Sequence, residues 1–174
     1  NLTGWFQAES PKQIQFTKYT KQDFQNIKSL GADVIRLPIK LHAMTSGAPS
    51  YTLDPLFLMF LDSVVTWAEE LDVHLILDNH TLDGTQTTDT TIAEILIPVW
   101  TQMAEHYRDH SRKIYYEVLN EPQGISDAKW NAIQQRVVAA IRTIDTVHTI
   151  IVGPANWNSY YNLSAMPVYS DTNL

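Results

Sequence analysis

Polar and aromatic side chains follow several apolar runs of this sequence, at the point where each run ends. Arg36 lies within one of these runs, two residues before Pro38, and the side chains that end or follow the other runs are Asp78, His80, Asn120, Glu121, Asn156 and Trp157. An acid, hydrogen-bonding partners and indole rings are what a polyol-like sugar requires of a binding site. The Asn120-Glu121-Pro122 step is the most informative, because it places an acid and an amide at the end of a strand that proline then stops.

The elements that must position these side chains form a regular alternation. The apolar runs, each expected to be a strand, cover 2–7, 33–39, 73–80, 113–120 and 148–153. They recur about every 40 residues with helical patterns between them, which is the rhythm of parallel βα units. The carboxyl ends of such strands meet at one rim, so the polar side chains are expected to gather there.

The helices between the runs carry recognisable start signals. Thr20 can cap a helix over 20–30, and Asp54 followed by Pro55 can start a long one. Thr91-x-x-Glu94 reads as a capping box for the next helix, and Ser126 as the cap of the last. Pro98 lies inside the third helical pattern and is expected to kink or split it.

Composition narrows the classes of protein. The chain has 174 residues, 44% hydrophobic and 18% charged, enough for one domain with a core. A net charge of -7 argues against nucleic acid as a partner, and no apolar run approaches the ~20 residues of a membrane span. The absence of cysteine excludes disulfides and thiolate metal sites. His106 and His110 have metal-pair spacing without an obvious third ligand, so no metal or cofactor is expected.

Side-chain alternation predicts which residues share the inner face of the sheet. Arg36 shares a parity with Pro38, Asp78 with His80, and Glu117 with Glu121. Glu117 is therefore expected in the layer below Glu121, and Asp78 in the layer below His80. Arg36 is the natural charge partner for a buried acid on this face.

Four segments resemble the successive strand motifs of family 5 glycoside hydrolases of the cellulase group: "DVIRLPI", "LILDNH", "YYEVLNEPQGI" and "HTIIVGPANWNSY". The resemblance covers nearly the whole chain, with the motifs in order. It implies an α/β fold of the TIM (β/α)8-barrel type, in which residues 1–174 form a partial catalytic domain with about the first five βα units. It also implies a secreted endo-β-1,4-glucanase with a retaining mechanism and a β-glucan substrate.

The resemblance also implies roles for single residues. Glu121 would be the general acid/base, and Asn120 would bind the sugar 2-hydroxyl. Arg36 would support the catalytic carboxylates, and His80 would be the histidine that ends the third strand.

Substrate contacts are expected from three further residues. Trp157 is expected as an aromatic subsite wall or as packing, with Asn156 beside it. His42 is either a glucose-subsite residue or a loop residue. Many relatives have a second histidine where this chain has Thr81, which leaves contacts on that side open.

The nucleophile of the family is a second glutamate at the end of strand seven, and no acid here occupies that position. We expect it beyond Leu174, so the 174-residue chain alone should be inactive, since a retaining reaction needs both carboxyl groups. A partial barrel leaves open sheet edges, from which we expect self-association or a complementing half-barrel. The alternatives are an inactive half-barrel that binds glucan weakly or acts as a scaffold, and a parent enzyme acting on mannan, xyloglucan or mixed-linkage β-glucan.

Overall fold

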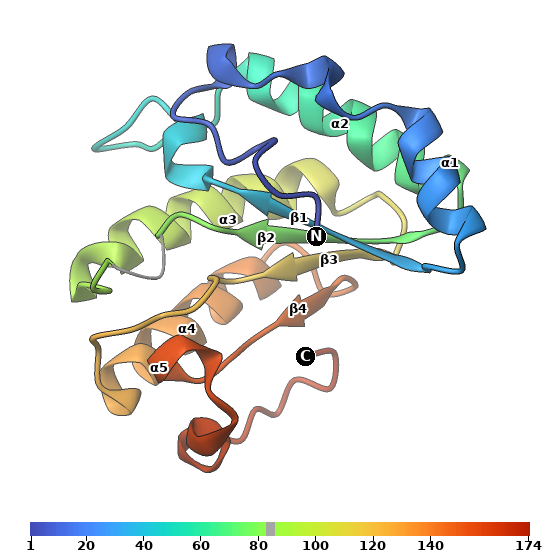
Figure 1. The fold of residues 1–174 in the computed structure, drawn as a ribbon. Coiled ribbons are helices and arrows are strands. Elements are labelled where there is room, and N and C mark those ends of the chain that lie inside the picture. The colour runs from blue at the N-terminus through green and yellow to red at the C-terminus, as the bar shows by residue number, and fades with distance from the viewer. Residues whose placement is uncertain (83–85) are drawn as a thin grey trace.

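A parallel four-stranded sheet organises the molecule (Figure 1). The computed structural model describes residues 1–82 and 86–174. The strands are β1 (Val34–Ile39), β2 (His74–Asn79), β3 (Ile114–Glu117) and β4 (Thr149–Ile151), and they neighbour one another in chain order. That order is the arrangement of consecutive strands in a (β/α)8 barrel, which confirms the predicted partial barrel.

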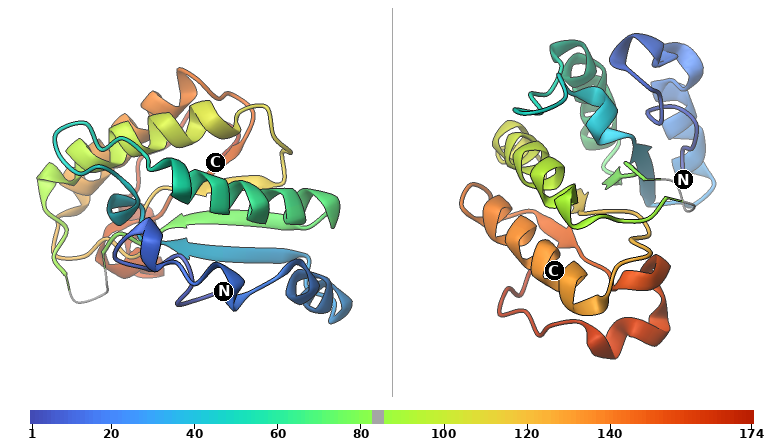
Figure 2. Two further views of the ribbon diagram at one scale, coloured as in Figure 1. Left: turned by 90° about the horizontal axis from the view of Figure 1, so that it is seen from above. Right: turned by 90° about the vertical axis from the view of Figure 1, so that its left-hand side faces the viewer.

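Helices cover one side of this sheet (Figures 1 and 2). They are α1 (Lys21–Ser29), α2 (Pro55–Glu70), α3 (Ala93–Tyr107) and α4 (Asp127–Arg142). The short α5 (Ala155–Asn158) follows β4 at the carboxyl end of the strands (Figure 1). Strand residues that face the helices are fully buried, as Leu37, Leu75 and Tyr116 show. None of the helices in the described ranges combines the length and the apolar content needed to cross a membrane.

The predicted strand over 2–7 is wrong as a regular strand. It makes one isolated parallel bridge, between Phe6 and Ile39, and the Leu2 N–H donates to the Arg36 carbonyl over 3.0 Å. Between these contacts Gly4 adopts a φ of +65°, which turns the chain and interrupts the ladder. Within residues 1–82 and 86–174 the sheet therefore has four regular strands, with the N-terminal segment touching the edge of β1.

The start of α3 and its course past Pro98 both differ from what the sequence predicts. Asp89 starts the segment by accepting a hydrogen bond from the Thr91 N–H over 2.8 Å, and a 3-10 turn over Thr90–Ile92 precedes the helix. Thr91, the expected cap residue, therefore lies inside that turn, while Glu94 lies in the first turn of α3. The predicted split at Pro98 is wrong, because the helix runs unbroken to Tyr107, and the alternative of a kink stays a prediction. Pro98 falls in the second helical turn, and the apolar face on both sides of it stays packed in the core.

The other helix starts agree with the sequence more closely. Thr20 and Asp23 form a capping box at α1, and the Asp54 side chain accepts from the Leu56 N–H over 2.7 Å at α2. Ser126 occupies the cap position of α4, but its side chain makes no capping hydrogen bond.

The face of the sheet away from the helices is open and largely apolar. It carries a hollow of about 620 Å³, lined by Val34, His74, Ile76, Tyr115, Thr149, Ile151, Val152 and Leu174. Val34 is 51% exposed there. In a closed barrel this face would be interior.

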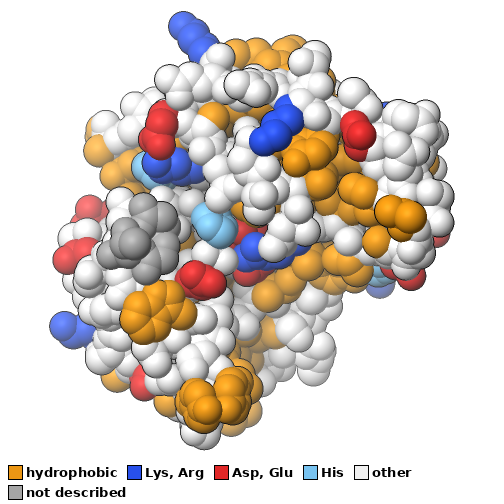
Figure 3. Space-filling model, in the orientation of Figure 1, with side chains coloured by type: hydrophobic (Ala, Val, Ile, Leu, Met, Phe, Trp, Pro, Cys, Tyr) orange, Lys and Arg blue, Asp and Glu red, His pale blue; other side chains and the backbone are white. Residues whose placement is uncertain are grey.

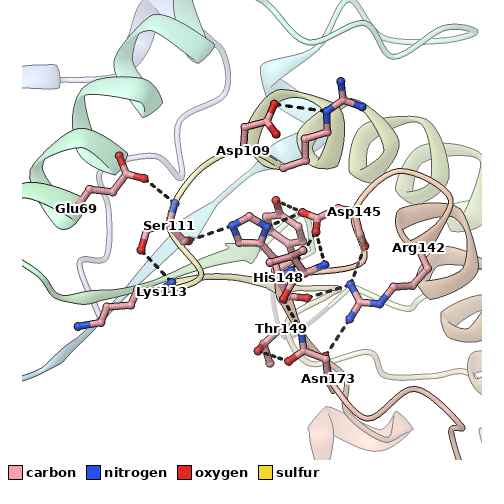
Figure 4. A network of polar contacts seen from close by, with 12 residues as sticks. Glu69, Asp109, Ser111, Lys113, Arg142, Asp145, His148, Thr149 and Asn173 are labelled. Atoms are coloured by element: carbon pink, nitrogen blue, oxygen red, sulfur yellow. Dashed lines mark hydrogen bonds and ion pairs between the residues drawn. The ribbon is translucent and has the colours of Figure 1, made fainter.

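A buried polar network ties the amino ends of β3 and β4 together (Figure 4). The Asp145 carboxylate accepts from the Tyr116 hydroxyl over 2.9 Å, from His148 Nδ1 over 2.6 Å and from the Val147 N–H over 2.8 Å. The other ring nitrogen of His148 faces the Ser111 carbonyl at 3.0 Å. Hydrogen bonds thus fix the amino ends of β3 and β4. The carboxyl ends of the strands lie at the opposite edge of the sheet.

The C-terminal residues lie against β4. The Asn173 carbonyl accepts from the Ile150 N–H over 3.1 Å and from Arg142 Nη2 over 3.0 Å (Figure 4). The Thr149 hydroxyl donates to the Asn173 side chain over 2.7 Å. The edge of β4 is therefore capped at this point by the chain itself.

Candidate active site

The carboxyl ends of the strands bring the predicted polar residues to one level. In the register of the sheet, Pro38 pairs with Asp78, and Asp78 pairs with Glu117. Just beyond the regular strands, the His80 N–H donates to the Ile39 carbonyl over 2.7 Å and the Asn120 N–H to the Asn79 carbonyl over 2.9 Å. In the orientation of Figure 1, Figure 3 shows cationic, acidic and histidine side chains gathered in the middle of the molecular surface, next to a band of hydrophobic side chains.

Arg36 is the hub of the cluster. Its Nε and Nη2 donate to the two carboxylate oxygens of Glu117 over 2.6 and 2.7 Å. The same Nη2 donates to Asn120 Oδ1 over 2.9 Å and lies 2.9 Å from Asp78 Oδ2. The predicted pairing of Arg36 with a buried acid is confirmed, and the fork geometry is one that only a guanidinium provides.

A second chain of contacts joins Asp78, His80 and Asn120. His80 Nδ1 lies 2.8 Å from Asp78 Oδ2, and Asn120 Nδ2 lies 3.4 Å from His80 Nε2. In the tautomer with its proton on Nδ1, His80 donates to Asp78 and accepts from Asn120. The Asn120 amide is thus oriented from both ends, by Arg36 at its oxygen and by His80 at its nitrogen.

Asp78 is the most buried acid of the group. Burial raises the pKa of its carboxyl, and the neighbouring Glu117 charge adds to that rise, while the His80 hydrogen bond and the Arg36 charge oppose it. Its Oδ1 has no hydrogen-bond partner among the described residues. Asp78 therefore holds His80 and Arg36 in place from beneath the surface.

Glu121 lies above this cluster, at the rim. Its side chain is exposed, whereas Asn120 and Glu117 are 7% and 9% exposed. Its φ is +45°, a left-handed conformation that is uncommon for a residue other than glycine. The chain therefore turns sharply at Glu121 and presents an accessible carboxyl next to a fixed amide.

His42 lies in the 3-10 turn over Leu41–Met44, beside the end of β1. Burial and the Lys40 charge lower the pKa of its imidazole. Its Nδ1 is buried and has no hydrogen-bond partner in the part of the chain that the structure describes. Thr81 is 3% exposed, accepts from the His42 N–H over 3.3 Å and donates to Asn79. The residue that departs from the family pattern is thus a buried hydrogen-bonding link between the His42 turn and the end of β2.

Trp157 and Asn156 lie in α5, after β4. The Trp157 N–H donates to the Pro122 carbonyl over 3.0 Å, which places this segment beside Glu121, and the Trp157 side chain is 49% exposed. Asn156 Nδ2 donates to Asn162 over 3.3 Å, so its amide is bound within its own loop and not to the Arg36 cluster. Trp5, by contrast, is a core residue at 2% exposure.

Sequence reasoning left one residue of this rim unassigned. Asn158 follows Trp157 and, with Glu117, lines a cavity of about 250 Å³ next to the cluster. Asparagine is the non-glycine residue that most readily adopts left-handed backbone, so the Asn-Trp-Asn triplet after a strand was the available signal.

The arrangement can move a proton at a bound oxygen atom. One accessible carboxyl stands over a rigid network of arginine, histidine, amide and two carboxylates. No group of three or more residues with metal-binding side chains occurs within the described ranges. The His106 and His110 rings instead face Asp62 and Glu69 at 2.8 and 3.1 Å.

Parallel βα units with acids and amides at their carboxyl rim define the class of (β/α)-barrel enzymes. A family model described as Cellulase (glycosyl hydrolase family 5) matches residues 3–174, and the chain belongs to that family.

Known proteins of the family resemble the chain along most of its length. It is 29% identical to Endoglucanase 3 of Fibrobacter succinogenes, over 100% of this chain and 29% of that protein. It is 27% identical to Endoglucanase C of Acetivibrio thermocellus, over 91% of this chain and 50% of that protein. The crystal structure of endoglucanase Cel5A from Thermotoga maritima superposes with a TM-score of 0.89 at 25% identity, covering 99% of this chain and 56% of that one. The chain thus spans about half, or less, of the length of these relatives.

Proposed function

We propose that this chain supplies the acid/base side of a retaining endo-β-1,4-glucanase (EC 3.2.1.4), as one part, residues 1–174, of its catalytic domain. The observation that carries the proposal is the Arg36 network with Glu117, Asn120 and Asp78, which lies close enough to the exposed Glu121 for Arg36 to feel its charge. In this role Glu121 gives its proton to the glycosidic oxygen as the bond to the anomeric carbon breaks.

Asn120 is oriented for the sugar 2-hydroxyl. Its oxygen is occupied by Arg36 at 2.9 Å, so its NH2 group is the end left for a ligand and for the weaker contact with His80. His80 and Arg36 act by positioning it. Trp157, Asn156 and His42 are proposed as substrate contacts around the rim.

Glu117 does not replace the nucleophile. Both of its oxygens are engaged by Arg36, at 2.6 and 2.7 Å, on the inner face of the sheet. A retaining enzyme needs a second carboxyl about 5–5.5 Å from the first. We therefore place the nucleophile outside the 174 residues and expect the isolated chain to be inactive, with activity in a longer form of the protein.

The substrate class follows from the same rim and from the relatives. An exposed indole beside an acid and an amide suits a neutral pyranose chain. Solved Cel5A structures of Thermotoga maritima are described in complex with cellobiose, at 27% identity and a TM-score of 0.82, and with mannotriose, at 25% identity and 0.89. A β-1,4-glucan is the proposed substrate, mannan, xyloglucan and mixed-linkage β-glucan are its competitors, and such a polymer implies secretion.

The test is Glu121→Gln in the longest expressed form of the protein. Gln keeps the shape but cannot donate the proton, so kcat on carboxymethylcellulose should fall about 100-fold or more. Glu105→Gln is the matched control, because Glu105 is exposed on α3 and pairs with Arg108 at the surface. Activity of Glu121→Gln within tenfold of the parent would refute the proposal.

A non-catalytic alternative rests on the open inner face of the sheet. A half-barrel that only binds glucan would migrate more slowly in affinity electrophoresis through a gel that contains β-glucan. No longer form of the protein would hydrolyse glucan. Hydrolysis that depends on Glu121 in the longer form would exclude this alternative.

A further inference from the structure

Three consecutive residues of α5 adopt left-handed backbone conformations. The φ values of Asn156, Trp157 and Asn158 are 61°, 60° and 53°. Outside glycine, each such residue is held in a sparsely populated and strained backbone region, and it persists only where surrounding contacts fix it. The contacts of this segment therefore show what the strained backbone is for.

These residues contact the segment that carries Glu121. The Trp157 N–H donates to the Pro122 carbonyl over 3.0 Å. In the orientation that satisfies both neighbours, the Asn158 amide nitrogen donates to the Pro154 carbonyl over 2.9 Å, and the amide oxygen accepts from the Glu121 N–H over 3.2 Å. Glu121 is itself left-handed, with a φ of 45°. Two strained segments from different strand ends thus hold each other.

Asn158 is also held from behind. A Cβ added to Gly153 would lie 2.4 Å from the nearer amide atom of Asn158 and 2.8 Å from its Cγ. Gly153 is fixed by α4, because its carbonyl accepts from the Trp130 indole over 2.8 Å and its N–H donates to Gln134 over 3.0 Å. The Asn158 amide therefore fits between a fixed glycine and the backbone of Glu121.

We infer that Asn158 is a positioning residue for the acid/base Glu121. This rests on the proposed function of Glu121. The side chain does not need to touch substrate: by binding the Glu121 N–H it fixes the backbone angle that sets the direction of the Glu121 side chain. The carboxyl is then aimed at the glycosidic oxygen while Asn120 is held separately by Arg36 and His80.

The test compares substrates with different leaving groups, which separates a loss of proton donation from a general loss of activity. A cello-oligosaccharide needs its leaving oxygen protonated, whereas a 2,4-dinitrophenyl cellobioside does not. Asn158→Gly is the main variant, because glycine accepts the positive φ and removes only the side-chain contacts. We expect kcat/KM in the longest active form to fall about tenfold or more on the oligosaccharide and to change less than about threefold on the dinitrophenyl substrate.

Three further variants complete the experiment. Gly153→Ala should give the same pattern, because the new methyl displaces Asn158. Tyr161→Phe is the control: Tyr161 is on the same loop and 78% exposed, and both substrates should be turned over as by the parent. Thermal melts establish that each variant is folded. Glu121→Gln must itself show the leaving-group pattern, which tests the proposed function apart from this inference.

The outcomes are distinct. If Glu121→Gln shows no dependence on the leaving group, the proposed role of Glu121 fails. If Glu121→Gln shows it while Asn158→Gly loses both substrates equally or neither, the inference about Asn158 is overturned and the role of Glu121 stands.

Discussion

At the scale of single residues, Arg36 connects the site to the fold. It bonds Glu117 and Asn120, which lie 81 and 84 positions away in sequence, and it reaches Asp78 on the neighbouring strand. Its side chain is 21% exposed. An arginine in this position attracts two carboxylates that would otherwise repel each other, and it sets the orientation of the amide.

Arg36→Lys should therefore be far from conservative. A lysine keeps the charge but cannot form the fork to Glu117 and still reach Asn120 and Asp78. We expect the free energy of unfolding of the 174-residue chain to fall by about 2–4 kcal/mol in urea titrations, because two buried acids lose partners. In the longer form kcat should fall about tenfold or more. The exposed Arg112→Lys is the control, and an Arg36→Lys chain as stable as that control would contradict this account.

Much of this residue pattern follows from the sequence. Side-chain alternation correctly places Arg36, Asp78 and Glu117 on one face, because a parallel sheet fixes both the parity and the level of each residue. The role of Asn158 does not follow, because it depends on where the loop after β4 meets the loop after β3. Contacts between two irregular segments have no periodic signal in the chain.

At the scale of elements, the predicted strands after residue 33 are confirmed and the one before it is not. A run such as 2–7 is apolar enough for a strand, but the turn at Gly4 is decided by its contacts with β1. The prediction of where α3 begins fails for a similar reason, because Asp89 takes the capping role that the sequence assigned to Thr91. Local propensity is a better guide to the existence of an element than to the residue at which it begins.

The Asp145 network predicts how the assembly of β3, α4 and β4 responds to pH (Figure 4). Burial alone would raise the pKa of Asp145, but hydrogen bonds from the His148 and Val147 N–H groups and from Tyr116 outweigh it, and the pKa is lowered. A carboxyl with a lowered folded pKa stabilises the protein above its unfolded pKa of about 3.9. That stability is lost as the pH falls through the lower folded value.

Asp145→Asn tests this at the level of the element. The Asp145 carboxylate is contacted by the Tyr116 hydroxyl, the Val147 and His148 N–H groups and His148 Nδ1. Because the variant loses this charge, its free energy of unfolding at pH 7 should be about 1–3 kcal/mol below that of the parent. The difference should shrink below about pH 4, as the parent protonates Asp145. Urea titrations across pH measure it, with the exposed Asp109→Asn as control. A difference that is independent of pH would show that the carboxylate charge has no part in the network.

At the scale of the whole molecule, the decisive feature is the uncovered face of the sheet. Both sheet edges are partly capped by the chain itself, at β1 by Phe6 and at β4 by Asn173. The apolar hollow of about 620 Å³ on the inner face is open among the residues that the structure describes. We propose that the 174-residue chain associates with itself through this hollow and not through its edges, because burying the exposed apolar surface is favourable.

The expected result is a dimer of the isolated chain at tens of micromolar, measured by light scattering after size exclusion. Val34→Lys should shift it toward monomer, since Val34 lines the hollow and a buried lysine would lack a partner. Val168→Lys is the matched control: Val168 is 97% exposed and lies outside the hollow, so the dimer should persist. Association that survives Val34→Lys would place the contact at the sheet edges. A parent chain that stays monomeric at these concentrations would refute self-association and leave a complementing half-barrel as the partner that the open face accommodates.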